Sequence, residues 1–186
     1  MDDRDIKIAG DRPSKDVERH ILKLSMGIDS VSVRLGTALG EKIAERFVAA
    51  LLEKGPGVGQ GSEDMLLQRQ ILLSFAALSG FERFCATADY VTVAKSSFLS
   101  YIKTHHPELY NGATDNGALS FYYLAFRRGG DVERSIGQTF AMLCSHDGDP
   151  VYQELGEALY CWFTSVVRRE EAKISNPEES NDEHTK

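Results

Sequence analysis

Apolar residues recur every three to four positions along most of this chain, and that period is typical of α-helices. The first stripe alternates steps of four and three and consists of Val17, Ile21, Leu24, Ile28, Val31, Leu35 and Ala38. It predicts a helix from about residue 14 to the late twenties, and another, continuous with it or restarted at Asp29-Ser30, that ends near Lys54. The stretch DSVSVRL (29–35) alternates like a strand, but no second strand signal exists to pair with it.

Glycines interrupt this first helical region. Gly27, Gly36 and Gly40 weaken the prediction of a single long helix, because glycine is a poor helix former. The apolar stripe packs either inside its own fold or against a partner helix, including a second copy of this chain. Packing inside the fold is favoured, because several apolar helices follow that need cover. The last turns before Lys54 are expected to bury Ile43, Phe47, Val48 and Leu51.

The most apolar helix is expected in the middle of the chain. The glycine-rich stretch GPGVGQGS (55–62) is interpreted as a connector, and Ser62 as the N-cap of the helix that follows. A helix that is apolar most of the way round lies at the centre of its fold. Its apolar residues are Leu66, Leu67, Ile71, Leu72, Phe75, Leu78, Phe81 and Phe84.

The next helix has Asp89 as a candidate N-cap and ends near Pro107, because the residue before a proline avoids the helical conformation. Its inner face is expected to consist of Val91, Ala94, Phe98, Tyr101 and Ile102. PELYNG (107–112) is expected to form one short turn that Gly112 closes.

The last third of the chain carries the clearest boundary signals. A helix starts at Thr114 or Asp115 and ends at Gly129-Gly130, and Asp131 caps the next one. Asp149-Pro150 starts the final helix, because an N-cap is followed by proline at the first helical position. This final helix is expected to bury Val151, Leu155, Leu159, Trp162, Phe163 and Val166.

Together these patterns predict an all-α fold, a single-domain helical bundle or array of about seven helices, with the C-terminal third arranged as antiparallel helical hairpins. We expect a flexible N-terminal segment at 1–13 and one all-helical domain at 14–174. Residues 175–186 hold four acidic residues and no apolar one, so we expect a disordered acidic tail.

Composition narrows the classes of function. The net charge of −7 over 186 residues disfavours nucleic acid and anionic membrane surfaces, which both reward a basic face. No apolar run is long enough to span a bilayer, and the first residues do not resemble a secretory signal. The three cysteines lie far apart and are odd in number, so they suit the reducing cytosol and not a disulfide framework.

The chain contains no complete motif of a cofactor-binding, metal-binding or catalytic site. The glycine-rich connector lacks the lysine that a phosphate-binding loop needs. The stretch CSHDGDP (144–150) offers Cys144, His146, Asp147 and Asp149, but no second ligand cluster accompanies it, and a structural turn is favoured over a metal site. His105 and His106 are adjacent and therefore point to different faces of a helix. We expect no cofactor, no bound metal and no catalytic residue.

The span SFYYLAFRRGGDVERSIGQTF (120–140) is the most suggestive one for binding. Its first interpretation is an antiparallel helical hairpin. Two adjacent tyrosines cannot both point into the core, so one of them, with Arg127 or Arg128, is a candidate contact for an acidic or aromatic partner. The full candidate binding surface comprises Tyr122, Tyr123, Phe126, Arg127, Arg128, His146, Asp149 and Trp162.

Two segments of this region resemble tetratricopeptide repeats: the turn GGDVERSI (129–136) and the helix start YQELGEAL (152–159). The interval from Leu124-Ala125 to Leu155-Gly156 is 31 residues, against about 34 in that family. No earlier copy is visible in residues 1–110. We attribute the resemblance to shared helical-hairpin physics and assign no family.

The sequence therefore predicts a non-catalytic cytosolic helical domain that acts as a protein-interaction or scaffold module, with a protein partner or self-association. The alternative is a small-molecule-binding or enzymatic helical bundle with a pocket near residues 120–150. A closed pocket with converging polar groups favours the alternative, whereas an exposed apolar patch or a stable dimer favours the interaction module.

Overall fold

A computed structural model describes residues 29–52 and 63–176, and these residues form seven helices and no strand. The helices are α2 (Ser30–Leu52), α3 (Glu63–Phe84), α4 (Ala88–His105), α5 (Pro107–Ala113), α6 (Asn116–Arg127), α7 (Val132–Leu143) and α8 (Pro150–Ser175). The expectation of an all-α fold is confirmed. The helix expected before residue 29, the connector at 55–62 with its cap Ser62, and residues 177–186 of the acidic tail lie outside the described residues.

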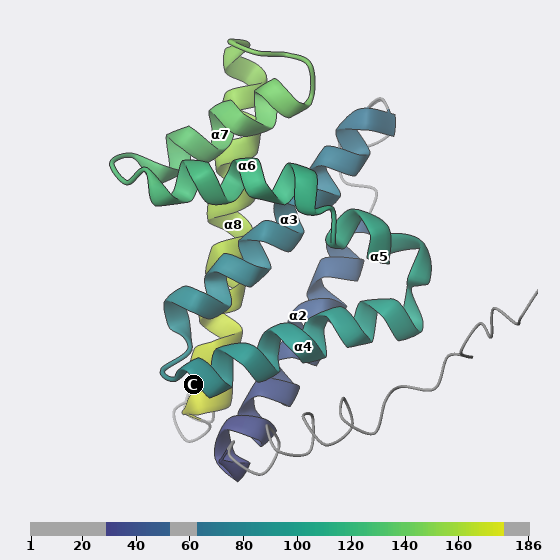
Figure 1. Ribbon diagram of the computed structural model, residues 1–186, viewed down its shortest axis with the longest axis vertical. Coiled ribbons are helices and arrows are strands. Elements are labelled where there is room, and N and C mark those ends of the chain that lie inside the picture. The colour runs from purple at the N-terminus through teal and green to yellow at the C-terminus, as the bar shows by residue number, and fades with distance from the viewer. Residues whose placement is uncertain (1–28, 53–62, 177–186) are drawn as a thin grey trace, which may run out of the picture.

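The helices pack as crossed pairs around α3 and α8 (Figure 1). The most extensive contacts join α2 to α4, α7 to α8, and α3 to α8. Helices α6 and α7 fold back on each other across the upper part of α8 in Figure 1, and α7 and α8 form the next antiparallel pair. The hairpins expected in the C-terminal third are therefore present.

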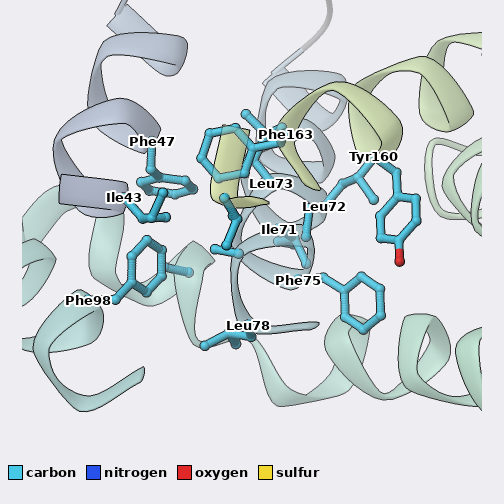
Figure 2. Close-up of a cluster of buried hydrophobic side chains, with 14 of the residues drawn as sticks. Ile43, Phe47, Ile71, Leu72, Leu73, Phe75, Leu78, Phe98, Tyr160 and Phe163 are labelled. Atoms are coloured by element: carbon cyan, nitrogen blue, oxygen red, sulfur yellow. The ribbon is translucent and has the colours of Figure 1, made fainter. Parts of the chain in front are cut away.

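Helix α3 supplies the centre of the core, as its apolar composition predicts. All eleven residues from 71 to 81 are buried, and Figure 2 shows five of their side chains, Ile71, Leu72, Leu73, Phe75 and Leu78, within the hydrophobic cluster. The ring of Phe75 stacks on Tyr122 at 5.4 Å between centroids and on Tyr160 at 6.1 Å. The first turns of α3 differ from expectation, because Leu66 and Leu67 are exposed. The helix is therefore apolar all round only where its neighbours, chiefly α8, α5, α4 and α6, cover it.

Glycines set the closest approaches between helices. A Cβ atom on Gly36 would lie 2.7 Å from Cβ of Val93, and one on Gly40 would collide with the backbone carbonyl of Ala94. These glycines do not end the helix, because α2 continues through both to Leu52. Their absent side chains let α2 and α4 pack almost backbone to backbone.

The caps of the later helices are those that the sequence predicts. The carboxylates of Asp115, Asp131 and Asp149 accept hydrogen bonds from first-turn amides of α6, α7 and α8. Between α6 and α7, Gly129 and Gly130 adopt φ values of 71° and 75°, which residues with side chains rarely adopt. At the described start of α2, Asp29 accepts from the amides of Val31 and Ser32, each at 2.9 Å.

Two boundary predictions are wrong. The N-cap of α4 is Thr87 and not Asp89, because the extended backbone of Thr87 lets its hydroxyl accept from the amide of Tyr90. Gly112 does not close a single turn either. It is buried inside α5, where a side chain would strike Gln70, and the helix is capped one residue beyond its end, at Thr114.

The buried face of α8 also differs from the predicted one. Val151 is 69% exposed and Trp162 is 46% exposed, although Phe163 and Val166 are buried as expected. The buried positions that the sequence did not predict include Gly156, Tyr160 and Val167. Gly156 explains the choice, because a Cβ there would lie 2.6 Å from Cβ of Phe140, so α7 can approach closely only on this side.

Two of the three described residues of the first apolar stripe lie away from the core, and the third, Leu35, packs against it. Val31 is 52% exposed, Ala38 is exposed, and Leu35 is half-buried. The face of α2 that packs on its neighbours consists instead of Ser32, Gly36, Leu39, Gly40, Ile43, Ala44 and Phe47. The expected packing of the stripe inside the fold therefore holds for Leu35 and is wrong for Val31 and Ala38.

Candidate functional site

Tyr122, the first residue of the predicted binding surface, belongs to the core. It is fully buried and stacks on Phe75 with 25° between the ring planes. Burial raises the pKa of its hydroxyl, and that hydroxyl has no hydrogen-bond partner among the described residues. It therefore cannot contact a partner without opening the fold.

Tyr123 and Phe126 lie at the edge of the same aromatic cluster. Both are half-buried, and both rings meet Phe75 edge to face, at 5.1 Å and 6.1 Å between centroids. Arg127 and Arg128 follow at the exposed end of α6. Of the two adjacent tyrosines, only one is fully inside, as the helical geometry requires.

His146 and Asp149 are held by the turn between α7 and α8. The His146 ring is exposed and stacks on Tyr152 at 3.9 Å, with 12° between the ring planes. The carboxylate of Asp149 accepts from the amide of Val151 at 2.9 Å and thereby caps α8. Within residues 29–52 and 63–176, no three histidine, cysteine, aspartate or glutamate side chains gather in a way that could hold a metal ion.

Cys144 is buried beside this turn. Burial, with a smaller contribution from the nearby Asp64 carboxylate, raises the pKa of its thiol to about 11. A thiol with a raised pKa is protonated at neutral pH and is a poor nucleophile. The pairing of Cys144 with His146 as a catalytic dyad therefore has no electrostatic support.

A hollow of about 560 Å³ lies between the end of α3, the α6–α7 turn and the middle of α8. Of the predicted surface residues, only Phe126 lines it. Glu82 in its wall also forms an ion pair with Lys95. The full lining is Glu82, Arg83, Phe126, Gly130, Asp131, Val132, Glu133 and Tyr160, an aromatic floor with three carboxylates and one guanidinium.

A second, smaller groove of about 270 Å³ lies between the C-terminal halves of α2 and α8. Trp162 forms part of its wall. Glu170, whose side chain is only 9% exposed, lies 3.1 Å from the guanidinium of Arg46 and 3.7 Å from the ammonium of Lys173. Arg169 adds a third cation to the lining. The walls therefore combine an aromatic ring with an excess of positive charge.

The predicted residues thus do not form one site. Phe126 and Trp162 line different hollows, Tyr122 is in the core, and His146 with Asp149 belongs to a turn. Sequence reasoning missed Arg46 altogether, because its partner Glu170 lies 124 positions further along the chain. For Lys173, the sequence shows only a cation in the last turn of a helix. That position is explained by the helix dipole and does not point to a binding groove.

None of the described helices has both the length and the apolar character needed to cross a membrane. Comparison of the chain with protein-family models, with curated proteins and with solved structures finds no match.

Proposed function

We propose that this chain is a non-catalytic cytosolic interaction module, and that its partner is a second copy of itself, bound through the apolar stripe on the outer face of α2. The observation that carries the proposal is the exposure of Val31 and Ala38, which the stripe's spacing would otherwise bury. The three cysteines, which form no disulfide with one another, suit a reducing compartment.

The spacing of the stripe is that of a coiled coil. Ile21, Ile28 and Leu35 occupy one core position of successive heptads, and Val17, Leu24, Val31 and Ala38 occupy the other. Isoleucine at the first position with leucine at the second favours two parallel strands, and the chain matches that pattern at Ile21, Leu24 and Ile28. Residues before 29 lie outside the described part of the chain, so their contribution rests on the sequence pattern alone.

The stripe ends where the outer face of α2 becomes charged. One turn after Ala38, Lys42 and Glu45 form an ion pair at 2.8 Å, and both side chains are about half exposed. A partner helix is therefore expected to contact the start of α2 and not its C-terminal half. Packing of Gly36 and Gly40 on α4 fixes the opposite face, so pairing requires no rearrangement of the fold.

The test compares two exposed valines on the same helix. Val31 lies on the stripe, whereas Val33 is 42% exposed but lies on a different face of α2. We expect the full chain to have the mass of a dimer in size-exclusion chromatography with light scattering, Val31→Glu to be a monomer, and Val33→Glu to remain a dimer. Circular dichroism checks that both variants stay folded.

Two results would contradict the proposal. One is a monomeric full chain at about 100 µM, a concentration at which a micromolar contact is saturated. The other is that Val31→Glu and Val33→Glu become monomeric to the same extent, because the contact would then not be specific to the stripe.

A small-molecule-binding role is the second proposal, and the hollow beside Phe126 and Tyr160 is the observation that favours it. Its volume of about 560 Å³ falls within the range of about 300–1,000 Å³ that ligand sites occupy. Three carboxylates in its lining favour a cationic aromatic ligand. Screening such compounds by NMR against the full chain and Glu133→Gln tests it, and binding that is equal in both would count against this hollow.

A further inference from the structure

We propose that the acidic C-terminal segment of this chain, residues 177–186, binds in the groove between α2 and α8 and covers Trp162. The proposal is independent of pairing through α2, because the groove is lined by the C-terminal half of that helix and by α8.

The groove has an unbalanced charge. Three cations line it, Arg46, Arg169 and Lys173, against the single carboxylate of Glu170. Arg46 and Lys173 share that carboxylate, while Arg169 forms no ion pair with any described residue. Since Trp162 and two alanines supply an apolar wall, the groove suits an extended segment that carries negative charge.

The proposed occupant has the complementary charge. The segment PEESNDEHTK (177–186) holds four carboxylates and one lysine, a formal charge of −3, and no apolar residue with which to bury itself elsewhere. Its point of attachment is also suitable, because Lys173 of the groove precedes the segment by only four residues. Helix α8 ends at Ser175, and its C-cap Asn176, with φ of −127° and ψ of 70°, lies outside the helical conformation immediately before Pro177.

The segment is long enough to reach Trp162. Fourteen positions separate Asn176 from Trp162, a distance of about 21 Å along a helix. Ten extended residues span about 33 Å. Because the segment is attached beside the groove, its effective concentration there is on the order of 1 mM, so even a contact with a Kd of about 1 mM would be half formed.

Trp162 provides a direct readout, because it is the only tryptophan of the chain. We expect deletion of residues 177–186 to raise the acrylamide quenching constant of its fluorescence about 2-fold, because a segment that covers the ring half of the time halves the access of the quencher. On the full chain, 1 M salt is expected to produce the same rise, because it screens charges beyond about 3 Å. Salt is expected to leave the truncated chain unchanged.

Substitutions test whether the charge of the segment, and not its length, is required, and whether the groove is the site where it binds. A chain with Glu178→Gln, Glu179→Gln, Asp182→Asn and Glu183→Gln keeps its length and is expected to behave like the truncation. Arg169→Glu in the groove is expected to do the same. Its neighbour Arg168 lines a different hollow, so Arg168→Glu serves as the matched control and is expected to quench like the full chain.

Three outcomes would overturn the proposal. Equal quenching of the full and truncated chains would show that the segment does not cover Trp162, and a similar rise in Arg168→Glu would show that the groove is not the site. If the difference in quenching between the full and the truncated chain disappears on dilution, or in the Val31→Glu variant, the segment that covers Trp162 belongs to a second copy of the chain. Mass and quenching are separate measurements, so failure of this proposal is distinguishable from failure of the self-association proposal.

Discussion

The closest approach between α2 and α4 gives a stringent test of the packing. At Gly40, an added Cβ would strike the carbonyl oxygen of Ala94, lie 2.9 Å from the amide nitrogen of Phe98 and lie 2.7 Å from Cβ of Ser97. Two of these three atoms belong to the backbone of α4. No side-chain rotation can therefore relieve the collision, and the two helices must move apart to accept Gly40→Ala.

Two effects of opposite sign decide the outcome of Gly40→Ala. Alanine in place of a helical glycine stabilises the helix by about 1 kcal/mol. Overpacking of a filled interior costs about 1–3 kcal/mol, and the upper end applies where the neighbours are backbone atoms. We therefore expect the free energy of unfolding to fall by about 2 kcal/mol, which corresponds to a fall in Tm of roughly 6 °C for a chain of this size.

Gly117→Ala is the matched control, since Gly117 is also helical but has only the Asp115 carboxylate nearby, at 3.2 Å. Helix propensity should dominate there, so the control is expected to be at least as stable as the unmodified chain. Urea unfolding followed by circular dichroism measures both variants. Equal stability of Gly40→Ala and Gly117→Ala would refute the reasoning, because it would mean that α2 and α4 are not in contact at Gly40.

Four further predictions concern residues near the candidate site. Tyr122→Phe is expected to raise the free energy of unfolding by about 1 kcal/mol in urea melts, because the buried hydroxyl has no partner among the described residues. Tyr160→Phe is expected to lower it, because that hydroxyl has Ser79 as a hydrogen-bonding neighbour. Since burial raises the pKa of Cys144 from 9.0 to about 11, the unfolded chain loses this proton first and stability falls between pH 9 and pH 11, by less than about 1.4 kcal/mol per pH unit for this group. Cys144→Ala should reduce that slope in urea midpoints measured across the range. Asp149→Ala is expected to destabilise α8 by about 1 kcal/mol in thermal melts, whereas Asp149→Asn, which keeps an acceptor for the first-turn amide, should change little.

The helix boundaries that the sequence predicted well are those with a local physical cause. Asp131 and Asp149 each precede a first turn whose amide they can reach, and Gly129-Gly130 adopts the positive φ that a tight reversal needs. Such signals are complete within four or five residues. No distant part of the chain is needed to interpret them.

The buried face of α8 was not predictable in the same way, because that helix carries two apolar stripes side by side. The period of 3.6 residues allows either Leu155 and Trp162 or Tyr160 and Phe163 to face the core. The second pair is buried because Gly156, on the same side of the helix, leaves room for Phe140 of α7 to pack closely. Nothing in the local sequence shows which helix packs there. The outer position of Trp162, and hence its place in the groove, follows from that choice.

The grouping of the candidate site residues depended equally on tertiary structure. The sequence placed Tyr122 and Phe126 on one helical face, and the structure shows Tyr122 under Phe75 with Phe126 at the rim. It could not bring Arg46 to Glu170, since an ion pair between α2 and α8 leaves no periodic signal in either helix.

The unbroken burial of α3 from Ile71 to Phe81 has a consequence for how this molecule is expected to unfold. A helix with one solvent face can fray or detach while the rest of a domain persists, but this stretch is enclosed on every side. Its amide protons are therefore expected to exchange with deuterium only when the whole described domain unfolds. Their exchange rates would then report the global free energy of unfolding without any denaturant.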